Sequence, residues 1–528
     1  MIRVRQVKVL VGEEKNLKRA IARKVGIKVN DILDIVIQRK SLDARDKNNI
    51  HYVYEVDIEV MKESNILKRK KSKDIFLTPK EEYQFPKKGK DPLSSRPIVV
   101  GSGPAGLFCA YMLAMQGYRP LVIERGEKIE DRVDAVFKFW NTGKLNPNSN
   151  VQFGEGGAGT FSDGKLNTLV KDKFFRGKKV FEIFVEHGVP YEIMYLQKPH
   201  IGTDLLRDVI ENIRNSIIRM GGEFRYTTLL TDIMIEDGKV VGIEVNHNEH
   251  IPCSVLVLAI GHSARDTFSM LYDKGVSMAA KAFAVGVRVE HLQEMIQMSQ
   301  YKTLDKRLPV ADYKLTYKTK SGRGVYSFCM CPGGYVVDAS SEYGRLAVNG
   351  MSYHARDSKN ANSALVVTVG PDDFGHHPLD GVVFQQQLEE KAFLVGNGHI
   401  PIQLYKDFLK KRVSFSFGKW TSQMKGNYQF SDLNQVLPDF VSDAIKEAMP
   451  YFGKKISGFD QGDAIFSGVE SRTSSPVRIL RNEDGVCNIL GLYPCGEGSG
   501  YAGGITTAAM DGVKISELII KKYQSFSD

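Results

Sequence analysis

PIVVGSGPAGLFCAYMLAMQGYRPLVIE, residues 97–124, decides the fold of this chain. An apolar strand runs into a Gly-rich turn, a helix of small residues continues to Gly117, and a second apolar strand ends at Glu124. Strand, glycine turn, helix, strand and terminal acid in this order are typical of a dinucleotide-binding βαβ unit. The stretch therefore predicts an α/β fold with a Rossmann-like sheet.

Each glycine of the turn has a mechanical reason. Gly101 permits the tight turn, Gly103 lets the backbone approach a pyrophosphate, and Gly106 allows the helix to pack closely on the strand. The helix N-terminus then faces the negative charge of the ligand. Glu124 is placed to bind ribose hydroxyls.

The composition is that of a globular protein. The chain has 528 residues, of which 42% are hydrophobic and 25% charged, so two or three domains are expected. Its six cysteines are too sparse and irregular for a disulfide framework, and no CxxC pair indicates zinc. No stretch approaches the ~20 apolar residues that a membrane span needs. We expect a soluble, cytoplasmic protein without a membrane partner.

The charge is concentrated at the N-terminus. Residues 1–95 hold 23 Lys and Arg against 14 Asp and Glu, which accounts for +9 of the total +10. Two interpretations stay open, a solvated surface and a docking site for RNA or an acidic protein. Either way, an electrostatic partner is expected to meet this region.

The N-terminal residues indicate a separate small domain. Alternating Val7, Val9 and Val11, an apolar helical face over 17–25 and a strict period of two over 50–60 predict strands around a helix. We therefore predict a basic α+β (ferredoxin-like) domain over residues 1–90. Lys68-Arg69-Lys70-Lys71 and the Pro- and Lys-rich stretch 86–97 indicate a solvated connector.

Beyond residue 97 the pattern is α/β. A helix over 203–220 precedes a strand and a meander, whose turn is Asp237-Gly238, and a buried strand over 255–260 stops at Gly261. Residues 91–268 are predicted to form the first part of the dinucleotide-binding domain. Residues 269–458 are predicted as an inserted mixed α+β substrate or cap domain, and residues 459–528 as the return to the first.

A second glycine segment lies near the C-terminus. Residues 491–505, GLYPCGEGSGYAGGI, lead from an apolar strand through Glu497 to a final helix. This segment resembles the C-terminal flavin motif of two-dinucleotide-binding-domain flavoproteins, with Glu497 where many relatives carry Asp. With the loop GEGGAGTFSDGKLNT at 154–168 and the strand end at Gly261, the chain resembles the uncharacterised bacterial FAD-dependent dehydrogenases of the glutathione-reductase superfamily, over most of residues 90–528.

The resemblance implies FAD rather than NAD as the tightly held dinucleotide. The final helix supports this, because its N-terminus offers backbone N–H groups and a favourable dipole end to a flavin pyrimidine. The loop 154–168 is expected to contact the flavin or its phosphates. The predicted cofactor contacts are Gly101, Ser102, Gly103, Pro104, Ala105, Gly106, Glu124, Arg125, Gly157, Ala158, Lys165, Gly261, Gly496, Glu497, Gly503, Gly504 and Ile505.

Two further segments, 154–159 and 498–503, also match GxGxxG. Neither follows a strong strand and opens a crossover helix that leads to an acid, so we reject both as additional fingerprints. No separate NAD(P)H domain is evident. NAD(P)H is therefore expected only as a transient electron donor near the flavin, and another donor is equally compatible.

The candidates for catalysis are weaker. Lys165 can offset phosphate or flavin-anion charge, and His200, His262 and His354 can protonate a substrate or serve structure alone. Arg472 is placed either to clamp an anionic substrate or the cofactor, or to form a turn-stabilising salt bridge. Cys329 and Cys331 are either a redox pair or, as i and i+2 spacing favours, inert thiols. No histidine spacing indicates a metal site.

These observations predict an FAD-dependent oxidoreductase that transfers a hydride through flavin N5 to or from an unidentified small molecule. One alternative is a flavoenzyme that acts on RNA through the basic N-terminal domain. Another is a non-catalytic FAD-binding interaction module.

Overall fold

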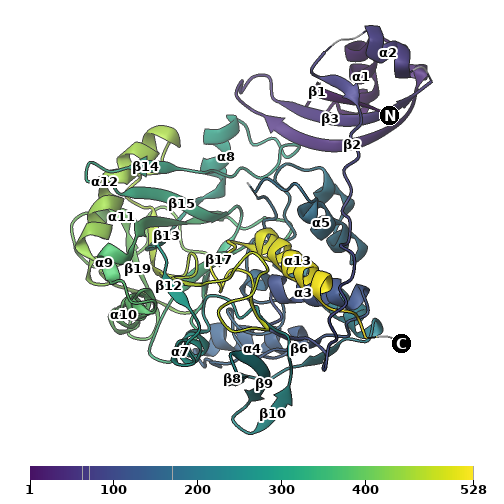
Figure 1. Cartoon of the computed structure of the whole chain (residues 1–528). Helices are drawn as coiled ribbons and strands as arrows, with labels where there is room; N and C mark the ends of the chain where they lie inside the picture. Colours follow the sequence, from purple (N-terminus) through teal and green to yellow (C-terminus); the bar gives the residue numbers. More distant parts are fainter. Residues whose placement is uncertain (62, 70–71, 169, 527–528) are drawn as a thin grey trace.

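The computed structural model describes residues 1–61, 63–69, 72–168 and 170–526 (Figure 1). Lys70 and Lys71 of the predicted connector lie outside the described residues. No helix within the described ranges is both long enough and apolar enough to cross a membrane.

The N-terminal residues form a four-stranded antiparallel sheet with two helices, set apart from the body of the molecule (Figure 1). Its strand order, β2-β3-β1-β4, with the element order βαββαβ, is that of a ferredoxin-like unit. Alternation along β1 buries Ile2 and Val4 fully, opposite Ile58 and Val56 of β3. The elements are β1 (Ile2–Leu10), α1 (Leu17–Val25), β2 (Ile32–Asp43), β3 (His51–Val60), α2 (Glu63–Arg69) and β4 (Ile75–Leu77).

A five-stranded parallel sheet, in the order β24-β11-β5-β6-β7, forms the centre of the dinucleotide-binding part. Every residue of its inner strands β11, β5 and β6, and of the edge strand β24, is buried, as expected of a sheet covered on both faces. The strands are β5 (Ile98–Val100), β6 (Leu121–Ile123), β7 (Glu223–Arg225), β11 (Leu256–Leu258) and β24 (Leu492–Pro494). The last strand therefore joins the sheet of the first βαβ unit, separated from β5 only by β11, although almost 400 residues lie between them in the sequence.

Helices α3 (Pro104–Met115) and α13 (Ile505–Lys522) pack against each other on one face of this sheet (Figure 1). A meander lies beyond the sheet and turns at Asp237-Gly238. The remaining elements of this part are α4 (Ile129–Thr142), α5 (Arg176–Glu186), α6 (Thr203–Arg219), β8 (Leu230–Glu236), β9 (Lys239–Val245), β10 (Glu249–Pro252) and α7 (Arg265–Asp273).

The inserted part contains a seven-stranded sheet in the order β14-β15-β18-β13-β22-β19-β21 and a three-stranded sheet, β17-β16-β20. Its strands are β13 (Phe283–Leu292), β14 (Thr316–Lys318), β15 (Gly324–Cys331), β16 (Tyr335–Asp338), β17 (Val348–Met351), β18 (Asn360–Val369), β19 (Ile400–Leu404), β20 (Met424–Lys425), β21 (Tyr428–Phe430) and β22 (Ile465–Glu470). Its helices are α8 (Gln293–Tyr301), α9 (Pro371–Phe374), α10 (Asp380–Val395), α11 (Tyr405–Phe408) and α12 (Asp439–Lys455).

The chain leaves this sheet later than the predicted boundary at residue 459. Strand β22 pairs with both β13 and β19, so the inserted sheet extends to Glu470. Val477–Ile479 (β23) then pairs with Met278–Ala280 (β12) in a two-stranded ladder between the parts. The boundary was misplaced because a fully buried strand has no alternation that assigns it to one sheet.

The contact between α3 and α13 depends on glycine. A Cβ built at Gly512 would lie 2.2 Å from the carbonyl oxygen of Ala105 and 3.0 Å from the N of Cys109. These neighbours are backbone atoms, so they cannot move aside as a flexible side chain can. The two helices can therefore approach this closely only with glycine at 512.

We expect Gly512→Ala to destabilise the protein by about 1–3 kcal/mol, although alanine is the better helix former, because the helices must separate. The matched control is Gly370→Ala, where a Cβ meets nothing within 4 Å. Urea unfolding of both variants gives the comparison. Equal unfolding midpoints would contradict the close-packing argument.

Candidate functional site

Three glycine segments meet at the N-termini of α3 and α13. We call residues 101–106, 154–159 and 496–505 together the glycine cradle. A Cβ built at Gly157 would lie 2.9 Å from the Cα of Gly103, and one at Gly496 would lie 2.5 Å from the Cβ of Ala105. The structure therefore places the first and last glycine segments side by side, as a common ligand requires.

The cradle has open space beside its helix ends. A Cβ at Gly503, Gly504 or Gly261 meets no atom within 4 Å, so these backbones border empty volume. The first N–H groups of α13 have no acceptor within the helix and are available to a ligand. We call residues 154–168 the glycine loop. Thr506 Oγ1 donates to the carbonyl of Leu166 at 2.7 Å, which ties the end of the glycine loop to this helix. The donor set and the space suit a dinucleotide with an anionic centre.

Glu124 is not free to bind ribose in this conformation. Its Oε2 accepts from the N and Oγ of Ser102, at 2.9 and 2.8 Å, and its Oε1 accepts from the N of Gly126 and Gly154, both at 3.0 Å. Four donors fill the acceptor positions of a carboxylate. Glu124 therefore links the glycine turn to the glycine loop, and its role as a ribose ligand stays a prediction.

Arg125 is paired within the protein. Its guanidinium donates to Asp266 at 2.7 and 3.0 Å and lies 4.1 Å from the ring centre of Phe153. A cavity of about 360 Å³, lined in part by Arg125, Gly126 and Leu229, opens at the carboxyl end of β6. This position, next to Glu124, is where a dinucleotide places its adenosine end.

Arg132, which the sequence interpretation missed, holds the glycine loop. Its fully buried guanidinium donates to five carbonyl oxygens, and Glu155 O is the nearest at 2.6 Å. The other acceptors are the carbonyls of Asn150, Val151, Gly154 and Gly157. Burial lowers the pKa of Arg132 to about 10, so the side chain stays charged at neutral pH. The sequence does contain a sign of this role, because Arg132 lies on the otherwise apolar face of α4 with Val136 and Trp140.

Lys165 and His200 lie together at the far end of the loop. Lys165 Nζ is 3.6 Å from Asp163, which also binds Arg356, and the backbones of Lys165 and His200 form an isolated bridge. His200 stacks on His354 with 5.2 Å between ring centres. Burial, and then the charge of Arg356, lower the pKa of His200 to about 4. His200 is therefore a neutral ring at physiological pH.

His262 and Glu497 face each other at the opposite wall of the cradle. His262 Nε2 is 4.0 Å from Glu497 Oε1, and Glu497 Oε2 accepts from the N of Gly504 at 3.2 Å. Burial raises the pKa of Glu497 to about 7, against the opposing effects of the Gly504 N–H and the charge of Lys281. Burial also lowers the pKa of His262 to about 3, helped by nearby arginine charges. The structure thus brings together a carboxyl that titrates near neutrality and a neutral imidazole.

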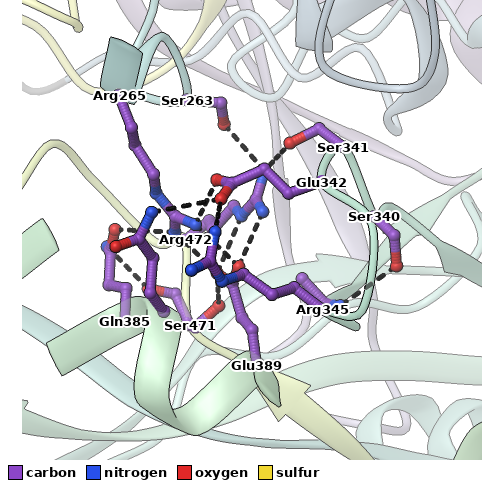
Figure 2. Close-up of polar contacts among 12 residues, drawn as sticks. Ser263, Arg265, Ser340, Ser341, Glu342, Arg345, Gln385, Glu389, Ser471 and Arg472 are labelled. Carbon is purple, nitrogen blue, oxygen red and sulfur yellow. Dashed lines mark hydrogen bonds and ion pairs between the residues drawn. The ribbon is translucent and has the colours of Figure 1, made fainter. Parts of the chain in front are cut away.

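Arg472 forms a buried ion pair, which corresponds to the salt-bridge alternative of its two predicted roles (Figure 2). Its Nε and Nη2 donate to both oxygens of Glu389, at 2.9 and 2.7 Å, and Arg265 binds the same carboxylate at 2.7 and 2.8 Å. Arg265 reaches Glu342 as well, and Glu342 also pairs with Arg345. We call Arg345, Glu342, Arg265, Glu389 and Arg472 the ion chain. It joins α7 of the dinucleotide-binding part to α10 of the inserted part.

Cys329 and Cys331 are free thiols on β15. Cys329 is exposed, and desolvation raises the pKa of its thiol to about 12, so the thiol stays protonated at neutral pH. Cys331 is buried and its Sγ donates to the carbonyl of Cys329 at 3.3 Å. Across the described ranges, the His, Cys, Asp and Glu side chains form no group of three or more that could hold a metal ion.

Comparison with known proteins gives the family. An uncharacterized protein of Clostridium beijerinckii is 49% identical to this chain over 530 residues, and the match covers 99% of both chains. The present chain belongs to the family of this clostridial protein. Residues 282–473 match a family model described as an FAD-dependent protein, C-terminal domain-like, and residues 99–129 match an NAD(P)-binding Rossmann-like domain. Residues 1–59 match a domain of unknown function.

FAD is therefore the dinucleotide of this protein, and the cofactor prediction is confirmed. Among solved structures, glycine oxidase from Bacillus cereus is 11% identical and covers 80% of this chain and 94% of its own, with a TM-score of 0.35. L-proline dehydrogenase from P. horikoshii is 12% identical and covers 82% and 94%, with a TM-score of 0.36. Similarities of this size do not extend to a substrate. Membership of the glutathione-reductase superfamily stays a prediction.

The ion chain generates a stability prediction. Replacing Glu389 by Gln leaves the guanidinium groups of Arg265 and Arg472 buried without their shared carboxylate, which is expected to cost about 3–5 kcal/mol. Burial alone would raise the pKa of Glu389, but the two arginine charges outweigh it and hold the pKa well below the ordinary value. The stabilisation is therefore fully present above the unfolded pKa of about 4.3 and is lost as the pH falls toward the folded pKa.

Urea unfolding of wild type and Glu389→Gln at several pH values measures this difference. It should be large at pH 7 and shrink on acidification. Glu390→Gln, on the exposed side of the same helix, is the control and should change stability by less than about 0.5 kcal/mol. A Glu389→Gln variant as stable as this control would show that the carboxylate does not hold the two parts together.

Proposed function

We propose that this protein is an FAD-dependent oxidoreductase that acts on a small molecule beneath the inserted sheet. FAD supplies hydride transfer through its N5 atom. The observation that carries the proposal is the convergence of the three glycine segments around open space at Gly261, Gly503 and Gly504. The family match to an FAD-dependent protein supports it.

The chain's own backbone would hold the cofactor. The turn at Gly103 and the facing Gly157 would admit the pyrophosphate, whose charge the N-terminus of α3 favours. Ile505 and Thr506, at the start of α13, would present N–H groups to the flavin pyrimidine, where negative charge develops on reduction, because the N–H groups of Gly503 and Gly504 already donate to Thr507 and Glu497. The glycine loop would stay in place because Arg132 binds its carbonyls.

The substrate would lie between the glycine loop and β15. Lys165 is partly exposed, with 28% of its side chain accessible, and its charge acts on both thiols of β15. Buried Arg288 donates to the carbonyl of Cys329 at 2.7 Å and fixes the backbone of β15 there. The ammonium of Lys165 would suit an acidic group on the substrate. A nicotinamide donor would bind at the same place, because we propose no second dinucleotide domain.

A second candidate function is action on RNA, and the basic surface of helix α1 supports it. Helix α1 exposes Lys18, Arg19 and Arg23, and no acid lies within the helix. The sheet of the same unit offers less, because Arg3 pairs with Asp57 at 2.8 Å. A partner that is RNA or an acidic protein therefore stays a prediction, directed at α1.

Gly103→Val tests the cradle. Gly103 has an extended backbone that valine can adopt, and a Cβ there meets only the Cα of Gly157, at 3.6 Å, so the fold should accept it. The isopropyl group would occupy the space that the pyrophosphate needs. We expect the FAD content of the purified protein, measured by absorbance, to fall at least ~10-fold, the equivalent of about 1.4 kcal/mol.

Gly370→Val is the matched control. Gly370 also has an extended backbone, also precedes a proline at the start of a helix, and has open space around its Cβ position. It should keep its FAD, and both variants should unfold at similar urea concentrations. Full FAD content in Gly103→Val would place the cofactor elsewhere.

Anaerobic reduction of the holoprotein tests the reaction. We expect flavin absorbance to bleach with NADH, with NADPH or with one member of a panel of small organic acids, and to return with an acceptor. Bleaching by a single donor would identify the reductive half-reaction. Bound FAD that no donor reduces would favour the non-catalytic module, and a colourless protein that takes up no FAD would overturn the cofactor site.

A further inference from the structure

His262 connects the glycine cradle to the ion chain. It follows Gly261 at the carboxyl end of β11, and its ring has Glu497 on one side and Ser263 on the other. Ser263 Oγ accepts from Arg472 Nη1 at 3.1 Å, so the hydroxyl is anchored to the ion chain (Figure 2). The contacts of Ser263 determine which nitrogen of His262 carries hydrogen.

The argument begins at Gln152. Its Nε2 donates to the carbonyl of Ala339 at 3.3 Å, which fixes the amide so that Oε1 faces Ser263. Ser263 Oγ donates its single hydrogen to this Oε1 at 3.1 Å. The hydroxyl therefore has only lone pairs for its 3.2 Å contact with His262 Nδ1. Nδ1 must be the donor, so it carries the hydrogen of the neutral ring.

The lone pair of that ring is then on Nε2, which faces Glu497. The two atoms, His262 Nε2 and Glu497 Oε1, are 4.0 Å apart, about 1 Å more than a hydrogen bond. Both side chains are largely enclosed, with 12% and 23% of their surfaces exposed. A rotation of the Glu497 side chain that shortens this distance by about 1 Å would bring a protonated carboxyl within hydrogen-bond distance of this acceptor.

We propose that Glu497 and His262 form a carboxylic acid–imidazole pair in the wall of the glycine cradle, in which the protonated Glu497 carboxyl donates a hydrogen bond to His262 Nε2. The proton stays on Glu497, and the pair in this form carries no net charge. Loss of the proton to solvent leaves the pair with one negative charge.

The charged groups around the pair set which form dominates. Arg472 and Arg265 face His262 and oppose the imidazolium, whereas Glu389 favours it. Lys281 and the N–H of Gly504 face Glu497 and favour the carboxylate, and Arg478 acts on Lys281. The proton therefore resides mainly on Glu497 below neutral pH. His262 acts as a positioning residue that binds the protonated carboxyl and releases the ionised one.

This inference rests on the proposed function in one respect, since the cradle is taken to hold FAD. Its first test does not need the cofactor. Nitrogen-15 NMR of the histidine-labelled full chain should show His262 as the Nδ1–H form at pH 7, assigned by loss of its signals in His262→Asn. An Nε2–H ring would overturn the proposal.

The second test measures the proton on Glu497. Infrared spectra of the full chain should contain a protonated carboxyl band that titrates near pH 7, the pKa that burial gives Glu497, and that is missing in Glu497→Gln. The same titration should appear as a shift of flavin absorbance in the oxidised holoprotein. Burial raises the pKa of Glu470 to about 7 as well, so the comparison is the difference spectrum of wild type minus Glu497→Gln. A difference spectrum without such a band would overturn the assignment.

The decisive variant is His262→Asn. The Asn amide can still donate to Ser263, but it has no basic nitrogen toward Glu497. Because an acceptor for the neutral carboxyl raises its pKa, the midpoint should fall by about one pH unit, and His262→Gln should fall less. The control His187→Asn, a buried histidine bonded to Ser216 far from the cradle, should leave the midpoint unchanged.

An unchanged midpoint in His262→Asn would overturn the pair. Should the protein hold no FAD, the NMR and infrared results would still decide between the pair and a merely structural histidine. The failure of the proposed function and the failure of this inference are therefore distinguishable.

Discussion

The structure depends on backbone-to-backbone contacts that exclude a Cβ. A Cβ at Gly106 would lie 1.9 Å from the carbonyl oxygen of Gly101, and the contact of Gly512 with Ala105 is nearly as close. Helices α3 and α13 therefore begin at the edge of the same sheet with their N-termini beside one cavity. A side chain at Gly106 would push α3 away from the glycine turn, and one at Gly512 would separate α13 from α3. Either change would move apart the segments that form the cradle. The cofactor site is in this sense a consequence of packing, and its glycines serve the fold and the ligand together.

Buried arginines hold the loops that such packing leaves without regular structure. The glycine loop forms no strand, and Arg132 holds it by donating to the carbonyls of Gly154, Glu155 and Gly157, together with those of Asn150 and Val151 just before it. The ion chain performs the corresponding task between the two large parts. A buried cation is costly unless its charge and its donors are compensated, and these arginines meet carbonyls or shared carboxylates, although Arg265 Nε has no hydrogen-bond partner. The geometry of the cradle is thus fixed by polar groups that do not themselves line it.

The sequence was sufficient where the fold depends on local backbone. The turn at Gly101 to Gly106 and the strand end and helix start over Gly496 to Ile505 could be predicted because they are short-range features with their own residue preferences, whereas their contacts with FAD stay a prediction. Arg472 and Glu124 show where this reasoning ends. Their partners, Glu389 and Gly154, are 83 and 30 residues away, and no local pattern announces them. Strand β22 was assigned to the wrong part for the same reason, since its neighbours β13 and β19 are distant in the chain.

The ion chain also reaches the chemistry of the cradle through a single serine. Arg472 donates to Ser263 Oγ, and Ser263 in turn contacts His262, so the residues that join the two parts also orient the ring that faces Glu497. The positive charges of Arg265 and Arg472 add to burial in lowering the pKa of His262 to about 3. A shift of the inserted part relative to the sheet would change the distance between these charges and the ring. The packing of the inserted part on the dinucleotide-binding part and the pKa of His262 therefore depend on the same charges. The charge of Glu389 partly offsets the effect of both arginines on the pKa of His262.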